Sequence, residues 1–320
     1  MNIADLLDPE LAPIFAALPE LEDITADPHL SRQTAAAMIL AAQNEARDSV
    51  PVTATDRSVP GPKGAPDVPL RIYYPSEPAA GGLLWLHGGG FILGDLDRAD
   101  PFCRRMALEV GCVVASVAYR LAPENPFPAA VEDCYAALQW LASSAAELGL
   151  DSRRIAIGGT SAGGCLAAAV ALMARDYHGP QLAFQLLLYP CLDDRHRTPS
   201  SHAITDSRTW NRQASLRAWQ AYLGSDRRHS VSPYAAPSRA TDLANLPPAY
   251  ILAAELDLLR DENVEYASRL MQAGVRTELH VFPGTFHGFD GLAPATQIGR
   301  RARSEYFAAT RDALTKQPRL

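Results

Sequence analysis

The stretch Gly159-Thr160-Ser161-Ala162-Gly163 follows an apolar run at 155–158 and precedes a run of small residues at 164–175. A short apolar segment, a serine flanked by glycines and a small-residue segment together predict a strand, a sharp turn and a helix. Such a turn exposes a serine hydroxyl in a strained backbone position, while the glycines let neighbouring backbone pass close by. We therefore expect Ser161 to be a nucleophile; the competing interpretation is a helix N-terminus that happens to contain serine.

A second glycine run, His87-Gly88-Gly89-Gly90-Phe91, directly follows the apolar segment 83–86. Backbone N–H groups aimed at a tetrahedral intermediate stabilise its negative oxygen by about 3 to 4 kcal/mol per donor. We expect the amides of Gly89 and Gly90, joined by that of Ala162, to form this oxyanion hole. The alternatives are a flexible loop or a phosphate cradle, but neither a P-loop lysine nor a spaced dinucleotide fingerprint follows.

The orienting acid is expected after the serine, on a loop that follows a strand. The predicted strand 249–254 opens onto Glu255, Asp257 and Asp261. Asp261 precedes an amphipathic segment and is interpreted as its helix cap. One apolar face of that segment is predicted to hold Val264, Ala267, Leu270 and Met271. Asp257 is therefore the preferred carboxylate and Glu255 the reserve, with a solvated loop as the alternative for all three.

The catalytic base is expected last along the chain. The predicted strand 276–282 ends in a turn that exposes His287 between glycines. We therefore predict that His287 is the base. His280 lies inside the strand pattern and is interpreted as a packed or edge side chain. The other histidines are interpreted as surface residues: 29, 178, 196, 202 and 229.

The composition narrows the function classes. A chain of 320 residues with 48% hydrophobic content can bury the core of one compact α/β domain with an added element. The net charge of −7 and the lack of a basic stripe interleaved with aromatic residues argue against nucleic acid as a partner. Five cysteines without metal or redox spacing indicate reduced thiols. We see no signal peptide and no apolar run approaching the roughly 20 residues of a membrane span, so a cytoplasmic protein is expected.

The order of predicted elements indicates the fold class. Residues 1 to about 48 are predicted to be helical, with apolar faces at 11–18 and 35–42. Seven prolines between 51 and 78 then exclude helices and favour short strands. Further strands are predicted at 82–87, 112–118, 154–158, 184–189, 249–254 and 276–282. Helices are predicted near 99–110, 129–148, 161–176, 261–273 and 296–315. This alternation predicts a mostly parallel sheet covered by helices on both faces.

The alternation breaks between 190 and 247, which predicts an insertion after a strand. A helical stretch there carries Trp210, Leu216, Trp219, Tyr222 and Leu223. Together with the N-terminal helices, the insertion would stand over the carboxyl ends of the strands, where parallel sheets bind ligands, and form a lid. In the alternative interpretation, to which we give equal weight, these side chains form the ordinary core of a helical layer.

Taken together, the motifs resemble the hormone-sensitive-lipase-like branch of the α/β-hydrolases, the bacterial family IV esterases. Six ordered segments carry the resemblance: 87–91, 119–124, 127–130, 159–164, 257–261 and 287–289. The resemblance implies an α/β-hydrolase fold, with a mostly parallel eight-stranded sheet, helices on both faces and a helical cap. It divides the chain into an N-terminal cap segment, 1–48, and a catalytic domain, 49–320, with a cap insertion at about 195–235.

The resemblance also implies residue roles. Ser161, Asp257 and His287 take the places of the catalytic triad, and Gly89, Gly90 and Ala162 those of the oxyanion hole. Many members have aspartate before the nucleophile and proline after the triad aspartate. Here Thr160 and Leu258 stand at those positions.

The expected function is a serine carboxylesterase that hydrolyses short- to medium-chain esters through an acyl-enzyme. It would act on a small-molecule ester with no metal or organic cofactor, because backbone amides stabilise the negative charge of the tetrahedral intermediate. The resemblance leaves a homodimer open. Two alternatives remain: a ligand-binding receptor on the same scaffold, similar to the plant gibberellin receptors that have lost the triad histidine, and an amidase or lactonase that uses the same triad.

Overall fold

The computed structural model describes residues 3–18, 27–28, 30–33, 52–224 and 231–315. Eight strands form one sheet in the order β1-β2-β4-β3-β5-β6-β7-β8. Pairing is antiparallel between β1 and β2 and between β2 and β4, and parallel from β4 to β8. The strands are β1 Thr53–Val59, β2 Val68–Tyr74, β3 Gly82–Leu86, β4 Val113–Val117, β5 Ile155–Thr160, β6 Phe184–Leu188, β7 Ala249–Ala254 and β8 Thr277–Phe282. The predicted α/β-hydrolase fold with its mostly parallel eight-stranded sheet is confirmed.

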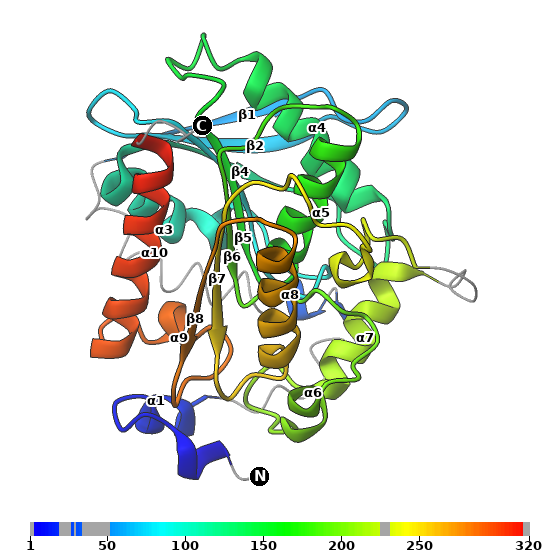
Figure 1. The fold of residues 1–320 in the computed structure, drawn as a ribbon, viewed down its shortest axis with the longest axis vertical. Coiled ribbons are helices and arrows are strands. Elements are labelled where there is room, and N and C mark those ends of the chain that lie inside the picture. The colour runs from blue at the N-terminus through cyan, green and yellow to red at the C-terminus, as the bar shows by residue number, and fades with distance from the viewer. Residues whose placement is uncertain (1–2, 19–26, 29, 34–51, 225–230, 316–320) are drawn as a thin grey trace.

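Helices cover both faces of this sheet. In Figure 1, α3 and α10 lie against one face, and α4, α5 and α8 lie against the other. The helices here are α3 Leu96–Met106, α4 Ala129–Ser143, α5 Ala162–Asp176, α8 Arg260–Gln272, α9 Phe289–Leu292 and α10 Gln297–Thr315. A π-helical turn, η3 Ala107–Gly111, extends α3. Because both faces are covered, every residue of β3, β4 and β7 is buried, which explains why these strands are almost entirely apolar.

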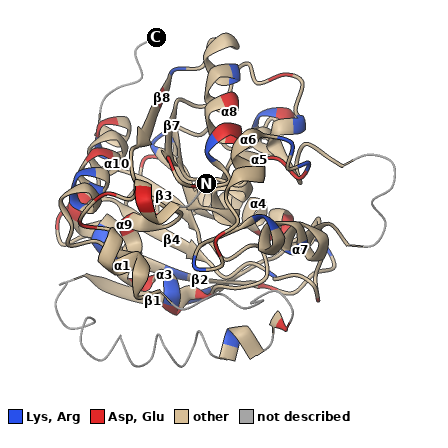
Figure 2. Cartoon of the chain, turned by 90° about the horizontal axis from the view of Figure 1, so that it is seen from below, with Lys and Arg blue, Asp and Glu red and all other residues tan. Residues whose placement is uncertain are grey.

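Two segments distant in sequence lie at one end of the sheet. The N-terminal helix α1 (Ala12–Ala16) and the helices α6 (Pro199–Ala203) and α7 (Arg212–Leu223) all lie near the carboxyl ends of the parallel strands (Figure 1). Two short 3₁₀ turns, η1 Ile3–Leu6 and η4 Pro237–Arg239, complete the described elements. Seen from this end, basic and acidic residues are interspersed on α8 and α10, whereas α7 carries arginines but no acidic residue (Figure 2).

Most predicted boundaries agree with the structure within one or two residues. The predicted helix 129–148 ends five residues early, at Ser143, and α3 begins three residues early, at Leu96. Leu11 and Phe15 are buried as the first N-terminal apolar pattern predicts, whereas the second apolar face, 35–42, lies outside the described residues. None of the helices in the described ranges has the length and apolar character that crossing a bilayer requires.

Predictions about α8 need correction. Ala267 and Leu270 are fully buried, but Val264 is 38% exposed and Met271 is 50% exposed. The buried stripe of α8 instead includes polar side chains, Glu262 and Asn263, which bind backbone groups of residues 190–193. A hydropathy pattern misses this stripe because hydrogen bonds, rather than apolar character, make the burial of these two side chains favourable.

One histidine prediction is wrong. His196 is interpreted from sequence as a surface residue, but it is only 3% exposed. Its Nε2 lies 2.8 Å from Oγ of Ser215 and its Nδ1 lies 3.0 Å from the carbonyl oxygen of Asp194. The ring therefore ties the start of the insertion to α7. A polar sequence context hides such a residue because its burial depends on a partner nineteen positions away.

Candidate active site

Ser161 occupies the sharp turn between β5 and α5. Its φ of 55° and ψ of −117° lie outside the regions that L-residues prefer, so surrounding contacts must hold it there. The Ser161 amide donates to the carbonyl oxygen of Leu188 at 2.9 Å. A Cβ on Gly163 would come within 2.0 Å of the carbonyl oxygen of Leu86, and one on Gly159 within 2.3 Å of Gly163 backbone. The two glycines are thus required by close backbone approach.

Three distant segments bring the predicted triad residues into contact. Oγ of Ser161 lies 3.0 Å from Nε2 of His287, and Nδ1 of His287 lies 2.6 Å from Oδ2 of Asp257. Asp257 is 1% exposed, and the His287 side chain 13%. In the neutral imidazole with hydrogen on Nδ1, that nitrogen donates to the carboxylate and Nε2 accepts from the serine. This arrangement can remove a proton from Ser161.

The structure distinguishes the three competing acids by what each one binds. Asp257 contacts the imidazole, and its other oxygen accepts from the amide of Leu259 at 3.0 Å. Glu255 instead accepts from the amide of Gly284 at 2.7 Å, which braces the loop that carries His287. Asp261 is not the helix cap: α8 begins at Arg260, and the Asp261 carboxylate accepts from the amide of Ser200 on α6. The cap prediction for Asp261 is therefore wrong.

The glycine run lies against the serine turn. A Cβ on Gly88 would lie 2.9 Å from Oγ1 of Thr160 and 3.4 Å from Cβ of Ser161. Gly89 and Gly90 have φ values of +129° and +60°, which explains why glycine is favoured at both. Within the described part of the chain, the amides of Gly89, Gly90 and Ala162 donate to no acceptor. Three unengaged N–H groups beside a serine hydroxyl can bind a developing oxyanion.

His87 packs against this glycine loop and supports it. Its imidazole stacks on Tyr119 at 4.2 Å between ring centroids, and its Nδ1 lies 2.9 Å from the carbonyl oxygen of Gly88. The Tyr119 hydroxyl donates to the carbonyl oxygen of His87 at 2.7 Å. Burial lowers the pKa of His87 to about 4. The ring is therefore neutral at neutral pH, and its Nδ1 lies against the carbonyl of Gly88 and the hydroxyl of Tyr119 rather than against a triad residue.

The lowered pKa of His87 predicts acid sensitivity of the fold. The unfolded chain gains a proton here near pH 6.5, whereas the folded chain gains it only near pH 4, so folded stability falls as pH falls between these values. The full loss is about 3 kcal/mol of unfolding free energy. We expect denaturant unfolding at pH 7 and pH 4.5 to show a smaller pH effect in His87→Gln than in wild type. Parallel losses in the two proteins would contradict the prediction.

Two aromatic side chains lie beside the site; Trp210 belongs to the predicted lid, whereas Tyr189 was not predicted to contact the site. The indole of Trp210 lies so close to Gly90 that a Cβ there would be 2.6 Å from Cη2, and its ring centroid is 6.4 Å from that of His287. Tyr189 packs edge-on against His287 at 4.8 Å. Tyr189 follows β6 and Trp210 lies in the loop between α6 and α7, so the direction of each ring depends on loop geometry that sequence periodicity does not specify.

Trp219 and Tyr222 of α7 form core. Tyr222 of α7 stacks on Phe91 at 3.8 Å, and Trp219 packs against the same ring at 5.3 Å. Both are almost fully buried. Of the two interpretations open at the sequence level, packing therefore describes Trp219 and Tyr222, while Trp210 lies beside the reaction centre.

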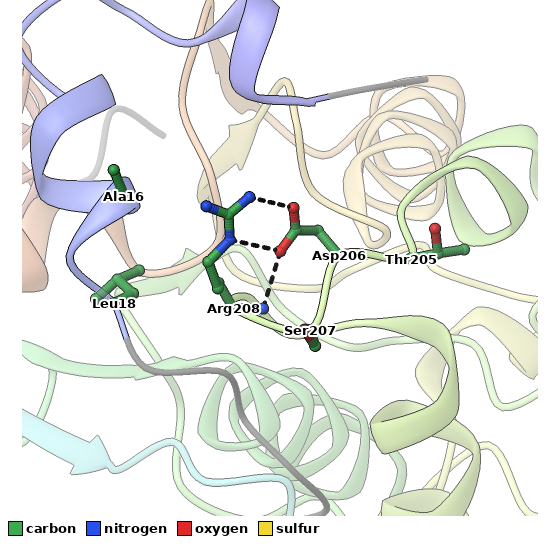
Figure 3. A pocket seen from close by; sticks show the side chains of 6 residues that line it. All are labelled: Ala16, Leu18, Thr205, Asp206, Ser207 and Arg208. Atoms are coloured by element: carbon green, nitrogen blue, oxygen red, sulfur yellow. Dashed lines mark hydrogen bonds and ion pairs between the residues drawn. The ribbon is translucent and has the colours of Figure 1, made fainter.

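A hollow of about 490 Å³ lies between the N-terminal segment and the insertion (Figure 3). Its lining residues are Ala16, Leu18, Thr205, Asp206, Ser207 and Arg208. The Arg208 guanidinium lies 4.5 Å above the ring of Phe15, which packs on Phe286, the neighbour of His287. No triad residue lines this hollow, so it adjoins the site through Phe15 and Phe286 without containing the reacting groups.

Comparisons with known proteins agree with this geometry. A protein-family model described as the alpha/beta hydrolase fold matches residues 83–291. The chain is 40% identical to Esterase LipI of Mycobacterium tuberculosis over 263 residues, covering 81% of this chain and 82% of the relative. It is also 40% identical to Carboxylesterase NlhH of the same organism, covering 79% and 81%. A solved structure titled Bacterial Heroin Esterase superposes with a TM-score of 0.92 at 46% identity, covering 98% of this chain and 99% of that one. The chain therefore belongs to the α/β-hydrolases, in the hormone-sensitive-lipase-like branch that its motifs predict.

Proposed function

We propose that this protein is a serine carboxylesterase that hydrolyses short- to medium-chain esters through an acyl-enzyme intermediate. The observation that carries the proposal is the continuous hydrogen-bond chain from Asp257 through His287 to Ser161, with distances of 2.6 and 3.0 Å. The esterase names of its relatives support the same reaction class.

In the proposed mechanism, Oγ of Ser161 attacks the ester carbonyl carbon while Nε2 of His287 takes the serine proton. The C=O π electrons move to oxygen, and the amides of Gly89, Gly90 and Ala162 donate to that oxyanion. Collapse breaks the bond to the alkoxide, which receives the proton from His287 and leaves as the alcohol. Water then repeats the sequence on the acyl-serine and releases the acid. Asp257 keeps the imidazole in the required tautomer throughout.

Two segments support the proposed cap, residues 1–48 and about 195–235. The insertion meets the glycine loop through the stacking of Tyr222 on Phe91. The N-terminal segment meets the histidine loop where the amide of Asp8 donates to the carbonyl oxygen of Gly284 at 2.9 Å. Arg32 donates to the carbonyl oxygens of Ile92 and Ala122, which follow the glycine loop. Each segment thus contacts a loop that carries a proposed site residue.

Steady-state hydrolysis of p-nitrophenyl acetate, butyrate and octanoate tests the proposed function. We expect turnover with the two shorter esters, and slower turnover of p-nitroacetanilide, whose amide nitrogen is a poorer leaving group. Faster cleavage of the anilide would make the protein an amidase, and binding without turnover would favour the receptor alternative.

The five cysteines, all free and buried, support the further proposal of a cytoplasmic location.

Trp210 is expected to limit substrate size. A substrate carbonyl held between Gly90 and His287 must lie against the indole of Trp210. The indole packs against Gly90, and its ring centroid lies 6.4 Å from that of His287. Trp210→Ala is expected to raise the ratio of kcat/KM for octanoate over acetate roughly 10-fold, since each newly buried methylene contributes about 0.8 kcal/mol. Trp210→Phe and Leu216→Ala, the latter at an exposed position of α7, serve as matched controls. An unchanged ratio in Trp210→Ala would show that other side chains set the limit.

A further inference from the structure

A buried carboxylate lies directly behind the site and has no part in the mechanism above. Oδ1 of Asp290 accepts from the Tyr189 hydroxyl at 2.8 Å, and Oδ2 accepts from the Tyr306 hydroxyl at 3.0 Å. All three residues are at most 5% exposed. They join the end of β6, the short helix α9 and the long helix α10. A buried carboxylate without hydrogen-bond partners is costly, so the two phenol donors make the burial of Asp290 favourable.

One of the two phenols also touches the imidazole. Tyr189 packs edge-on against His287, with ring centroids 4.8 Å apart and planes at 63°. Tyr189 has a φ of +37°, a left-handed conformation that is strained for a residue with a Cβ. Its amide donates to the carbonyl oxygen of Leu252 at 2.7 Å. The backbone is thus held at one end of the side chain and the hydroxyl at the other.

The imidazole needs more than one restraint. The hydrogen bond from Nδ1 to Asp257 fixes one atom of the ring, but a single hydrogen bond leaves the ring free to tilt about it. The ring edge of Tyr189 restricts that tilt from the side. Because proton transfer depends on the placement of Nε2 toward Ser161, a small tilt lowers the rate without weakening substrate binding.

We propose that Tyr189 is a positioning residue for His287, held in place by its hydrogen bond to Asp290, while Tyr306 binds the other carboxylate oxygen without contacting the imidazole. Burial raises the pKa of Asp290, while the two phenol hydrogen bonds and the nearby charge of Arg303 oppose the rise. The role given to Tyr189 does not depend on titration of that carboxyl, since the geometry alone supplies the restraint. The inference rests on the proposed esterase function, in which His287 is the base.

The two tyrosines allow a matched test. Tyr189→Phe and Tyr306→Phe each remove one hydroxyl from the same carboxylate, but only Tyr189 contacts His287. We expect similar decreases in melting temperature. We expect kcat for p-nitrophenyl acetate to fall roughly 10-fold in Tyr189→Phe with KM within about twofold, and to stay within about twofold in Tyr306→Phe. The rate of fluorophosphonate labelling should follow kcat.

A third variant keeps the test independent of the folding of Tyr189→Phe. Asp290→Asn keeps the side-chain volume but replaces a charged acceptor with a weaker neutral one, so kcat should fall at unchanged KM. Equal kcat losses in Tyr189→Phe and Tyr306→Phe, or wild-type kcat in Asp290→Asn despite a lower melting temperature, would overturn the inference and leave the cluster a purely structural role. Wild-type turnover is measured first, so failure of the proposed function is seen separately from failure of this inference.

Discussion

Replacing Ser161 with alanine is expected to lower kcat for p-nitrophenyl esters by about a millionfold, as loss of the nucleophile does in serine hydrolases. The change removes one oxygen, the atom that lies 3.0 Å from Nε2 of His287. No other hydroxyl is shown in contact with that nitrogen among the described residues, so the imidazole would have no serine to activate. The measurement is initial velocity at saturating ester, with purity controlled so that traces of wild type are excluded.

A matched control is Ser116→Ala. Ser116 is also fully buried, but it lies within β4 and contacts no triad residue in the described structure. Its kcat should stay within about twofold of wild type. Equal melting temperatures for Ser161→Ala and wild type would show that the lost rate reflects chemistry. Turnover by Ser161→Ala above one hundredth of the wild-type rate would refute the nucleophile assignment.

The second large effect is expected at the orienting acid. Asp257→Asn should lower kcat about 10⁴-fold, because an amide in place of the carboxylate favours the wrong imidazole tautomer. Glu255→Gln is the matched comparison, since Glu255 lies two residues away but binds the amide of Gly284 instead of the imidazole. Its kcat should fall less than about tenfold, with a modest loss of stability from the weakened hydrogen bond. A larger loss in Glu255→Gln than in Asp257→Asn would reverse the assignment that the geometry supports.

Motifs that depend on backbone geometry could be predicted from the sequence. At positions 89, 159 and 163 a Cβ would collide with backbone, and at positions 88 and 90 it would crowd neighbouring side chains, so these sites favour glycine. Buried parallel strands likewise leave long apolar runs, which is why β7 matches its predicted bounds at both ends. Chain order then suffices to place a serine, an acid and a histidine on neighbouring loops.

Contacts that depend on tertiary pairing could not be predicted. Glu262, Asn263 and His196 are buried through hydrogen bonds to distant residues, and nothing in their local pattern signals those partners. The same holds for Trp210 and Tyr189, whose rings reach the site from irregular loops. The choice of Asp257 over Glu255 also needed coordinates, because two acids separated by one residue leave a strand end on the same side.

The most direct test of the central claim is the mass of the protein after reaction with a fluorophosphonate, followed by peptide mapping. We predict one phosphonyl group per chain, attached to the peptide that contains Ser161, with esterase activity lost in proportion to labelling. A fully inhibited protein labelled at another residue, or an active protein in which Ser161 stays unmodified under excess reagent, would contradict the account.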